Sequence, residues 1–175
     1  FVSGTFVYSK TDEPKGILRG EFVNTLKNVK GDWKIYKSYR FNETTNNISI
    51  VSSLYDLFSK GDVPSVLALM DEKIVWNEAE SNSLADGNPY IGPEAVVNGI
   101  FARIGGMYKS FSLKNIKLHE MNDNQVLATL YYVIETKSGK NYTVQAAHHW
   151  TLKDGKIVGF QQYADTKKLA KSEEQ

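Results

Sequence analysis

HHWTLKDGKIVGFQQYADT, residues 148–166, predicts a β-hairpin that carries polar side chains on a largely apolar face. The Asp154–Gly155 pair is the turn signal between its two strands. A similar stretch, GDWKIYKSYRFN at residues 31–42, aligns with residues 154–165 at an offset of about 122 residues, roughly one small domain. We therefore expect the chain to open partway through one domain and then to complete another.

The composition is that of a globular protein and excludes several classes of partner. The chain has 175 residues, 41% of them hydrophobic, and a formal net charge of +1. No apolar run approaches the about 20 residues that a membrane-spanning helix needs, so we expect no membrane partner. The balanced charge gives no electrostatic reason to expect a nucleic acid. A small neutral or weakly polar ligand is the expected partner.

The chain has no cysteine. Disulfides, thiolate catalysis and thiolate metal sites are therefore excluded, and the absence suits either the cytoplasm or the periplasm. Because Phe1 rather than Met stands first, we expect the N-terminus to be truncated or processed. The sequence leaves the localisation open.

The first 42 residues predict three strands, which alternation places at 2–9, 17–27 and 33–41. Three strands with one apolar face need a cover, so we expect them to pack on another domain, another chain or a missing half. The turn-like residues 43–47 predict a linker, and residues 48–175 predict the second domain.

In the second domain the sequence predicts helices first and strands afterwards. Apolar spacing indicates a helix around 51–58, a short helix capped by Asp62 and a helix opening at 92–94. A strand at 73–78 and a polar loop at 79–91 come between them. Strands then follow, at 108–119, 125–136, 141–152 and 156–164. This order predicts an α+β domain with a curved antiparallel sheet, helices on one face and a pocket between the layers.

The order of elements and three segments resemble the nuclear transport factor 2 (NTF2) superfamily, and within it the SnoaL-like and ketosteroid isomerase-like proteins. The segments are SLYDLFSKGDVPSVLALMDEKIVWNE (53–78), YIGPEAVVNGIF (90–101) and the hairpin at 148–166. Together they span nearly all of residues 48–169. The resemblance implies a cone-shaped, cystatin-like fold around an apolar cavity, usually paired as a homodimer across the open sheet face. Residues 1–42 look like the last strands of a second copy, which implies a tandem protein.

Glu78 is the first candidate catalytic residue. Strand alternation places its carboxylate on the side of Ile74 and Trp76, where a charge is costly unless it has a partner or a function. The resemblance implies that Glu78 stands where the isomerases keep their general base. The alternative is that the strand frays and Glu78 faces water at the pocket rim.

His148 is the second candidate catalytic residue, because it shares a strand face with Val144, Ala146 and Trp150. The resemblance implies that it stands where the isomerases keep a protonated Asp that donates to the developing enolate. An imidazole can donate there too, or carry a proton near neutral pH. The alternative is a core histidine satisfied by a backbone or hydroxyl partner. His149 points to the opposite face of the strand, where we expect it to contact a second subunit of a dimer.

Aromatic and polar residues near these two are candidates for ligand binding. The isomerases' oxyanion-hole Tyr corresponds to Leu54 here, and one helical position rotates the adjacent Tyr55 about 100° away from that direction. Asp165, in the ending YADT, resembles a SnoaL-like feature at the cavity mouth, and it could equally cap a terminal helix. The full candidate set for ligand binding is Leu54, Tyr55, Trp76, Tyr142, Trp150, Tyr163 and Asp165.

The sequence predicts neither a metal site nor a cofactor. His148 and His149 point to opposite strand faces and cannot chelate one ion together, and the Gly105–Gly106 pair follows a helix instead of preceding one. The leading hypothesis is cofactor-free proton transfer on an apolar carbonyl compound, of isomerase, cyclase or dehydratase type, with Glu78 as base and His148 as acid or donor. The alternative is a non-catalytic ligand-binding or dimerisation module.

Overall fold

The computed structural model describes residues 2–9, 17–29, 32–43 and 47–174. Contacts between Cα atoms divide the chain into two units, Phe1–Asn46 and Asn47–Gln175. Among the described residues, helices that are both long and apolar enough to cross a membrane are absent.

The first unit contains three strands, β1 (Val2–Ser9), β2 (Ile17–Val29) and β3 (Asp32–Glu43). They form an antiparallel sheet in the order β1-β2-β3. The strands lie close to the ranges that alternation predicts. Whether residues 1–42 are the C-terminal part of a second copy of the fold stays a prediction.

The second unit begins with two helices that the apolar spacing predicts. They are α1 (Asn47–Ser59) and α2 (Val63–Ala68). The Asp62 side chain caps α2 by accepting a hydrogen bond from the Ser65 N–H, as the sequence predicts. Pro64 lies in the first turn of this helix. Strand β4 (Met70–Asn77) follows at once.

The polar loop after β4 contains two short elements and leads into a composite helix. The 3-10 helix η1 (Ser83–Gly87) is followed by strand β5 (Tyr90–Ile91). The composite helix consists of α3 (Pro93–Val96), the π-helical η2 (Val97–Phe101) and α4 (Ala102–Met107).

Four long strands and a terminal helix complete the second unit. They are β6 (Tyr108–Met121), β7 (Gln125–Thr136), β8 (Asn141–Lys153), β9 (Lys156–Ala164) and α5 (Thr166–Glu173). The six-stranded sheet has the order β5-β4-β9-β8-β7-β6. Pairing is antiparallel except between β4 and β9, which run parallel. The helices and strands that separate β4 from β9 in the chain supply the long crossover that a parallel pair requires.

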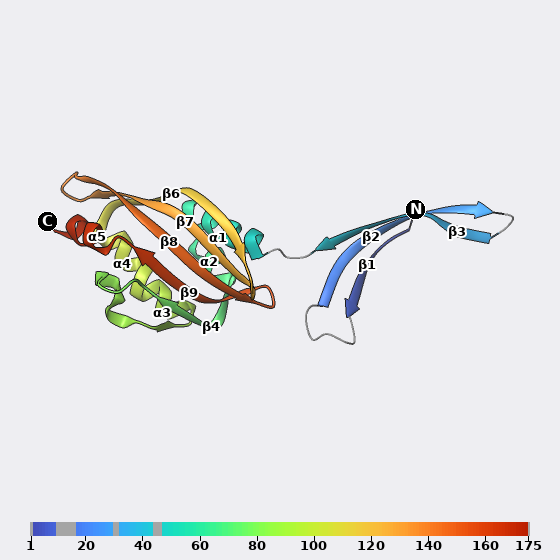
Figure 1. The fold of residues 1–175 in the computed structure, drawn as a ribbon, viewed down its shortest axis with the longest axis horizontal. Coiled ribbons are helices and arrows are strands. Elements are labelled where there is room, and N and C mark those ends of the chain that lie inside the picture. Colours follow the sequence, from blue (N-terminus) through green and yellow to red (C-terminus); the bar gives the residue numbers. More distant parts are fainter. Residues whose placement is uncertain (1, 10–16, 30–31, 44–46, 175) are drawn as a thin grey trace. The chain divides into compact units, whose positions relative to one another are not determined.

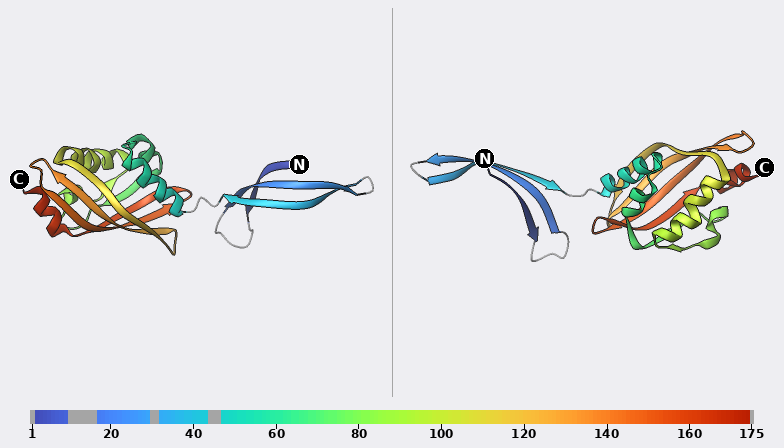
Figure 2. Two further views of the ribbon diagram at one scale, coloured as in Figure 1. Left: turned by 90° about the horizontal axis from the view of Figure 1, so that it is seen from above. Right: turned by 180° about the vertical axis from the view of Figure 1, so that it is seen from behind.

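Helices α1, α2, α3 and α4 lie on one face of this sheet (Figures 1 and 2). The core lies between the two layers, and on β7 and β8 it takes the even-numbered residues. The α+β fold with a curved sheet and helices on one face is therefore confirmed.

Candidate functional site

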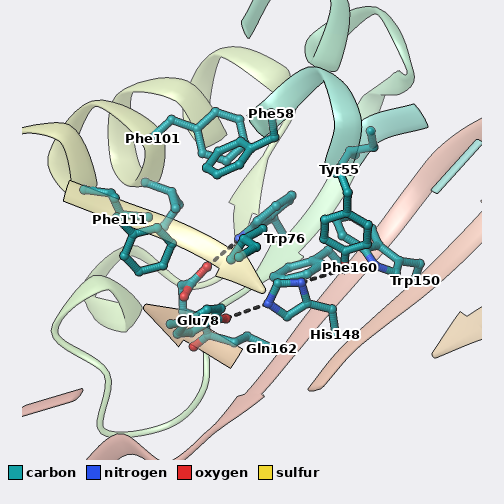
Figure 3. Close-up of a pocket in the computed structure, with 15 residues that line it drawn as sticks. Tyr55, Phe58, Trp76, Glu78, Phe101, Phe111, His148, Trp150, Phe160 and Gln162 are labelled. Carbon is teal, nitrogen blue, oxygen red and sulfur yellow. Dashed lines mark hydrogen bonds between the residues drawn. The ribbon is translucent and has the colours of Figure 1, made fainter. Parts of the chain in front are cut away.

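A small cavity lies between the helices and the sheet of the second unit. Its volume is about 50 Å³. Its wall is mostly apolar, but Glu78 and His148 both reach it (Figure 3). The lining residues are Leu54, Tyr55, Phe58, Trp76, Glu78, Ile100, Phe101, Ile104, Phe111, Leu113, Tyr132, His148, Trp150, Phe160 and Gln162.

Glu78 follows the last residue of β4, and its side chain is buried on the side of Ile74 and Trp76. It is 3% exposed, so it does not face water at the rim. The Trp76 Nε1–H donates to Glu78 Oε1 at 2.7 Å, and the Asn82 amide donates to Glu78 Oε2 at 2.9 Å. Burial raises the pKa of Glu78 to about 7, although the hydrogen bonds partly oppose this rise.

His148 lies on β8 between two tyrosine hydroxyls. Its Nδ1 is 2.8 Å from the Tyr55 oxygen, and its Nε2 is 2.5 Å from the Tyr132 oxygen. Burial lowers the pKa of His148 to about 3, because a cationic ring would lose its hydration without gaining a counter-charge. The imidazole is therefore neutral near pH 7, and both of its nitrogens have partners.

Gln162 and Asn82 connect the surroundings of His148 to those of Glu78. The Gln162 Oε1 accepts from the Ala79 backbone N–H at 3.1 Å and from Asn82 Nδ2 at 2.8 Å. The backbone donor fixes the amide orientation, so Gln162 Nε2–H donates to the Tyr132 hydroxyl at 3.0 Å. Hydrogen bonds thus run without interruption from Glu78 through Asn82, Gln162 and Tyr132 to His148.

Aromatic rings hold this polar network in place. Trp76 stacks on Phe160 with ring centroids 3.7 Å apart, and Trp150 packs against both rings. Phe58 and Phe101 pack edge to face on the helical side of the cavity, away from Glu78 and His148 (Figure 3). Such contacts restrict rotation and keep bulk water from the carboxyl group.

The SnoaL-like domain profile matches residues 51–160. The chain belongs to the SnoaL-like domain family. The resemblance inferred from the sequence is thus confirmed, and the SnoaL-like domain contains the whole cavity except Gln162.

Several solved structures resemble the SnoaL-like domain, and the match extends over nearly the whole length of each of them. An NTF2-like protein from Burkholderia thailandensis is 26% identical, with a TM-score of 0.67, over 73% of this chain and 96% of that one. TerC, co-crystallised with polyporic acid, is 22% identical, with a TM-score of 0.66, over 74% and 99%. A candidate polyketide cyclase from Xanthomonas campestris pv. campestris is 18% identical, with a TM-score of 0.64, over 73% and 96%. The latter two likenesses show the fold alone. No curated protein matches the chain.

Four of the residues predicted to bind ligand line the cavity of the SnoaL-like domain, and three do not. Leu54, Tyr55, Trp76 and Trp150 belong to its wall. Tyr142 is half-buried further along β8, next to the core. Tyr163 and Asp165 line a groove on the opposite face of the sheet, and Asp165 also caps α5 by accepting from the Lys168 N–H. The cap alternative for Asp165 is thereby confirmed.

Tyr55 lies about 100° from Leu54 around the axis of α1, but this rotation does not take its side chain away from the cavity. Both residues line it, and the Tyr55 hydroxyl contacts His148 and accepts from Trp150 Nε1–H at 2.9 Å. The 100° rotation describes the Cα–Cβ direction, whereas the buried face of α1 is wide enough for both side chains.

Tyr132, Asn82 and Gln162 are polar residues of the site that the sequence analysis did not assign to it. Tyr132 occupies an even position on β7 among buried residues, so alternation could have placed it beside His148. Asn82 lies in the loop after β4, where no repeating pattern predicts which way a side chain points. Within the part of the chain that the structure describes, no group of three or more His, Asp or Glu side chains could hold a metal ion.

Proposed function

We propose that the SnoaL-like domain binds a small, mostly apolar carbonyl compound in this cavity and transfers a proton on it. Glu78 takes the proton from the carbon next to the carbonyl group and later returns it. One of the two hydroxyl groups on either side of His148 donates a hydrogen bond to the carbonyl oxygen. The reaction is of isomerase or lyase type and uses the chain's own side chains.

The observation that carries this proposal is a buried carboxyl group and a buried imidazole on the wall of one apolar cavity. With a pKa of about 7, Glu78 is about half ionised at neutral pH, which suits a group that must both accept and release a proton. Its two N–H donors leave lone pairs on the carboxylate for a third partner.

Similar proteins support an organic ligand. The SnoaL-like neighbours include one co-crystallised with polyporic acid and three candidate polyketide cyclases. The cavity of about 50 Å³ is smaller than the roughly 150 Å³ that accommodates benzene, so a ligand must displace part of the wall. The half-buried side chains of the wall are the ones that a ligand would displace, namely Phe58, Phe101, Ile104, Phe111 and Leu113.

Substituting Glu78→Gln tests the proposal. The probe is cyclohexanone in heavy water, and the measurement is the rate of hydrogen exchange next to its carbonyl group, followed by NMR. We expect the variant to lose roughly 10² to 10⁴-fold in rate, the usual contribution of general acid–base catalysis, while ketone affinity changes little. Glu80→Gln, at an exposed position two residues away, is the matched control and should leave the rate unchanged.

A non-catalytic ligand-binding module is the second candidate function. It is favoured by the small cavity and by the internal hydrogen bonds that already occupy Glu78 and His148. An unaccelerated exchange rate with the wild-type protein, or equal losses of rate and affinity in Glu78→Gln, would support it over catalysis.

A further inference from the structure

The hydroxyl groups of Tyr55 and Tyr132 and the ring of His148 form a three-membered hydrogen-bonded group, here called the Tyr-His-Tyr triad. The triad has two internal contacts, one at each ring nitrogen. Each hydroxyl oxygen also accepts a hydrogen bond from outside the triad, Tyr55 from Trp150 and Tyr132 from Gln162. Within the described residues, neither hydroxyl has a further acceptor in hydrogen-bonding range.

Counting protons in the triad gives an excess of one. Burial raises the pKa of both tyrosines, so each hydroxyl keeps its proton, and the neutral imidazole carries a single N–H. Three protons thus serve two internal hydrogen bonds. If the ring proton is on Nδ1, it is donated to Tyr55, Tyr132 donates to Nε2, and the Tyr55 proton is left over. If the ring proton is on Nε2, the Tyr132 proton is left over instead.

We infer that the triad presents one unpaired hydroxyl proton to the cavity, and that a bound ligand selects which tyrosine donates it by fixing the tautomer of His148. Both tyrosines line the cavity, so the donor can face a ligand in either state. The inference rests on the proposed ligand-binding function and assigns it a ligand class, compounds with an uncharged acceptor oxygen such as a ketone. His148 is then a positioning residue, because neither of its nitrogens is free to contact the ligand.

Nitrogen-15 NMR of the histidine rings in the full chain tests this inference. Cyclohexanone is the probe, and methylenecyclohexane, which has the same shape without the acceptor oxygen, is the control ligand. We expect the ketone to shift His148 toward one neutral tautomer and to bind about tenfold more tightly than the hydrocarbon, the gain typical of one hydrogen bond. His119 and His149 lie outside the cavity lining and should not respond.

Replacing one tyrosine of the triad or the other should give opposite tautomers of the His148 ring. With ketone bound, Tyr55→Phe leaves Tyr132 as the only donor and should place the ring proton on Nε2. Tyr132→Phe should place it on Nδ1. The double variant should lose the tenfold preference for the ketone. Tyr131→Phe, a neighbouring phenol on the opposite strand face, is the matched control and should behave as the wild type.

Three results would overturn the inference: a cationic His148 ring at pH 7, equal responses to ketone and hydrocarbon, or the same ketone-bound tautomer in both single variants. If the variants fold poorly, the wild-type comparison of the two ligands still decides. The readout needs no turnover, so a tautomer shift without hydrogen exchange would uphold the inference and reject catalysis. Exchange that depends on Glu78 without a tautomer shift would do the reverse.

Discussion

Glu78 and His148 are both buried and are joined by one hydrogen-bonded network, yet burial moves their pKa values in opposite directions. It raises the pKa of Glu78 from 4.5 to about 7 and lowers that of His148 from 6.5 to about 3. In both cases the apolar surroundings disfavour the charged form. Near neutral pH the site therefore holds at most one charge, on Glu78, and the hydrogen-bonded chain between the residues joins mostly neutral groups.

These shifts predict compensating effects on stability between pH 4.5 and 6.5. In this window the folded protein keeps the Glu78 proton that the unfolded chain has released, so rising pH destabilises the fold through Glu78. The unfolded chain keeps a His148 proton that the folded protein excludes, so rising pH stabilises the fold through His148. The two contributions have similar size and opposite sign, and they nearly cancel in the wild type.

The substitutions Glu78→Gln and His148→Gln should separate the two contributions. Relative to the wild type, the free energy of unfolding of Glu78→Gln should rise by about 2 kcal/mol from pH 4.5 to 6.5. That of His148→Gln should fall by about as much. Urea unfolding at a series of pH values measures both slopes. A Glu78→Gln difference that stays flat across the window would show that Glu78 has an ordinary pKa.

At the scale of single residues, the sequence predicted directions along strands better than contacts across layers. Alternation correctly placed Glu78 beside Trp76 and His148 beside Trp150 on buried faces. It could not bring Tyr55 to His148, because that contact depends on the reach of a long side chain between α1 and β8. The Asn82 contact to Glu78 depends on the path of a loop, which follows no period.

At the scale of elements, the strand boundaries were predicted closely, because turn residues such as Asp154–Gly155 interrupt the alternation of apolar and polar residues. The parallel pairing of β4 with β9 was not predicted. It depends on how the chain crosses the helical layer between these two strands, and the alternation within a strand does not record that path. The π-helical turn η2 was also missed. Its apolar residues fit ordinary helical spacing, so the sequence carries no distinct signal for it.

Packing of the composite helix against Tyr90 makes a prediction about two glycines. A Cβ atom at Gly99 would lie 2.1 Å from Tyr90 Cε1, and the Tyr90 hydroxyl is held by donating to the Leu84 carbonyl oxygen. Gly105 lies inside α4, not after the helix as the sequence predicts, and no atom lies within 4 Å of its Cβ position. The two sites therefore offer the same substitution with and without a steric obstacle.

Gly99→Ala should lower the free energy of unfolding by roughly 1 to 3 kcal/mol, the usual cost of overpacking. Gly105→Ala should leave it unchanged or raise it by up to about 1 kcal/mol, because alanine favours the helix. Chemical denaturation of both variants beside the wild type measures the difference. Equal effects at the two sites would mean that Tyr90 does not occupy the space beside Gly99.

At the scale of the whole molecule, the face of the six-stranded sheet that lies opposite the helices carries exposed aromatic side chains. Tyr131 is 38% exposed and Tyr163 is 56% exposed. They line a groove of about 590 Å³ together with uncharged residues such as Gln145 and Ala147, and with Lys117 and Asp165. Exposed aromatic side chains on neighbouring strands are typical of interfaces between subunits.

We propose that two chains pair through this face, as the resemblance to NTF2-like proteins implies. Sedimentation equilibrium of the full chain should then give the mass of a dimer. A Tyr131→Asp/Tyr163→Asp variant should shift it toward the monomer, because pairing would bury charges of the same sign without partners. Met121→Lys, which changes an exposed apolar residue outside the groove, is the control and should leave the dimer intact. A wild-type monomer at high micromolar concentration, or a dimer that survives both aspartates, would show that the face serves another purpose.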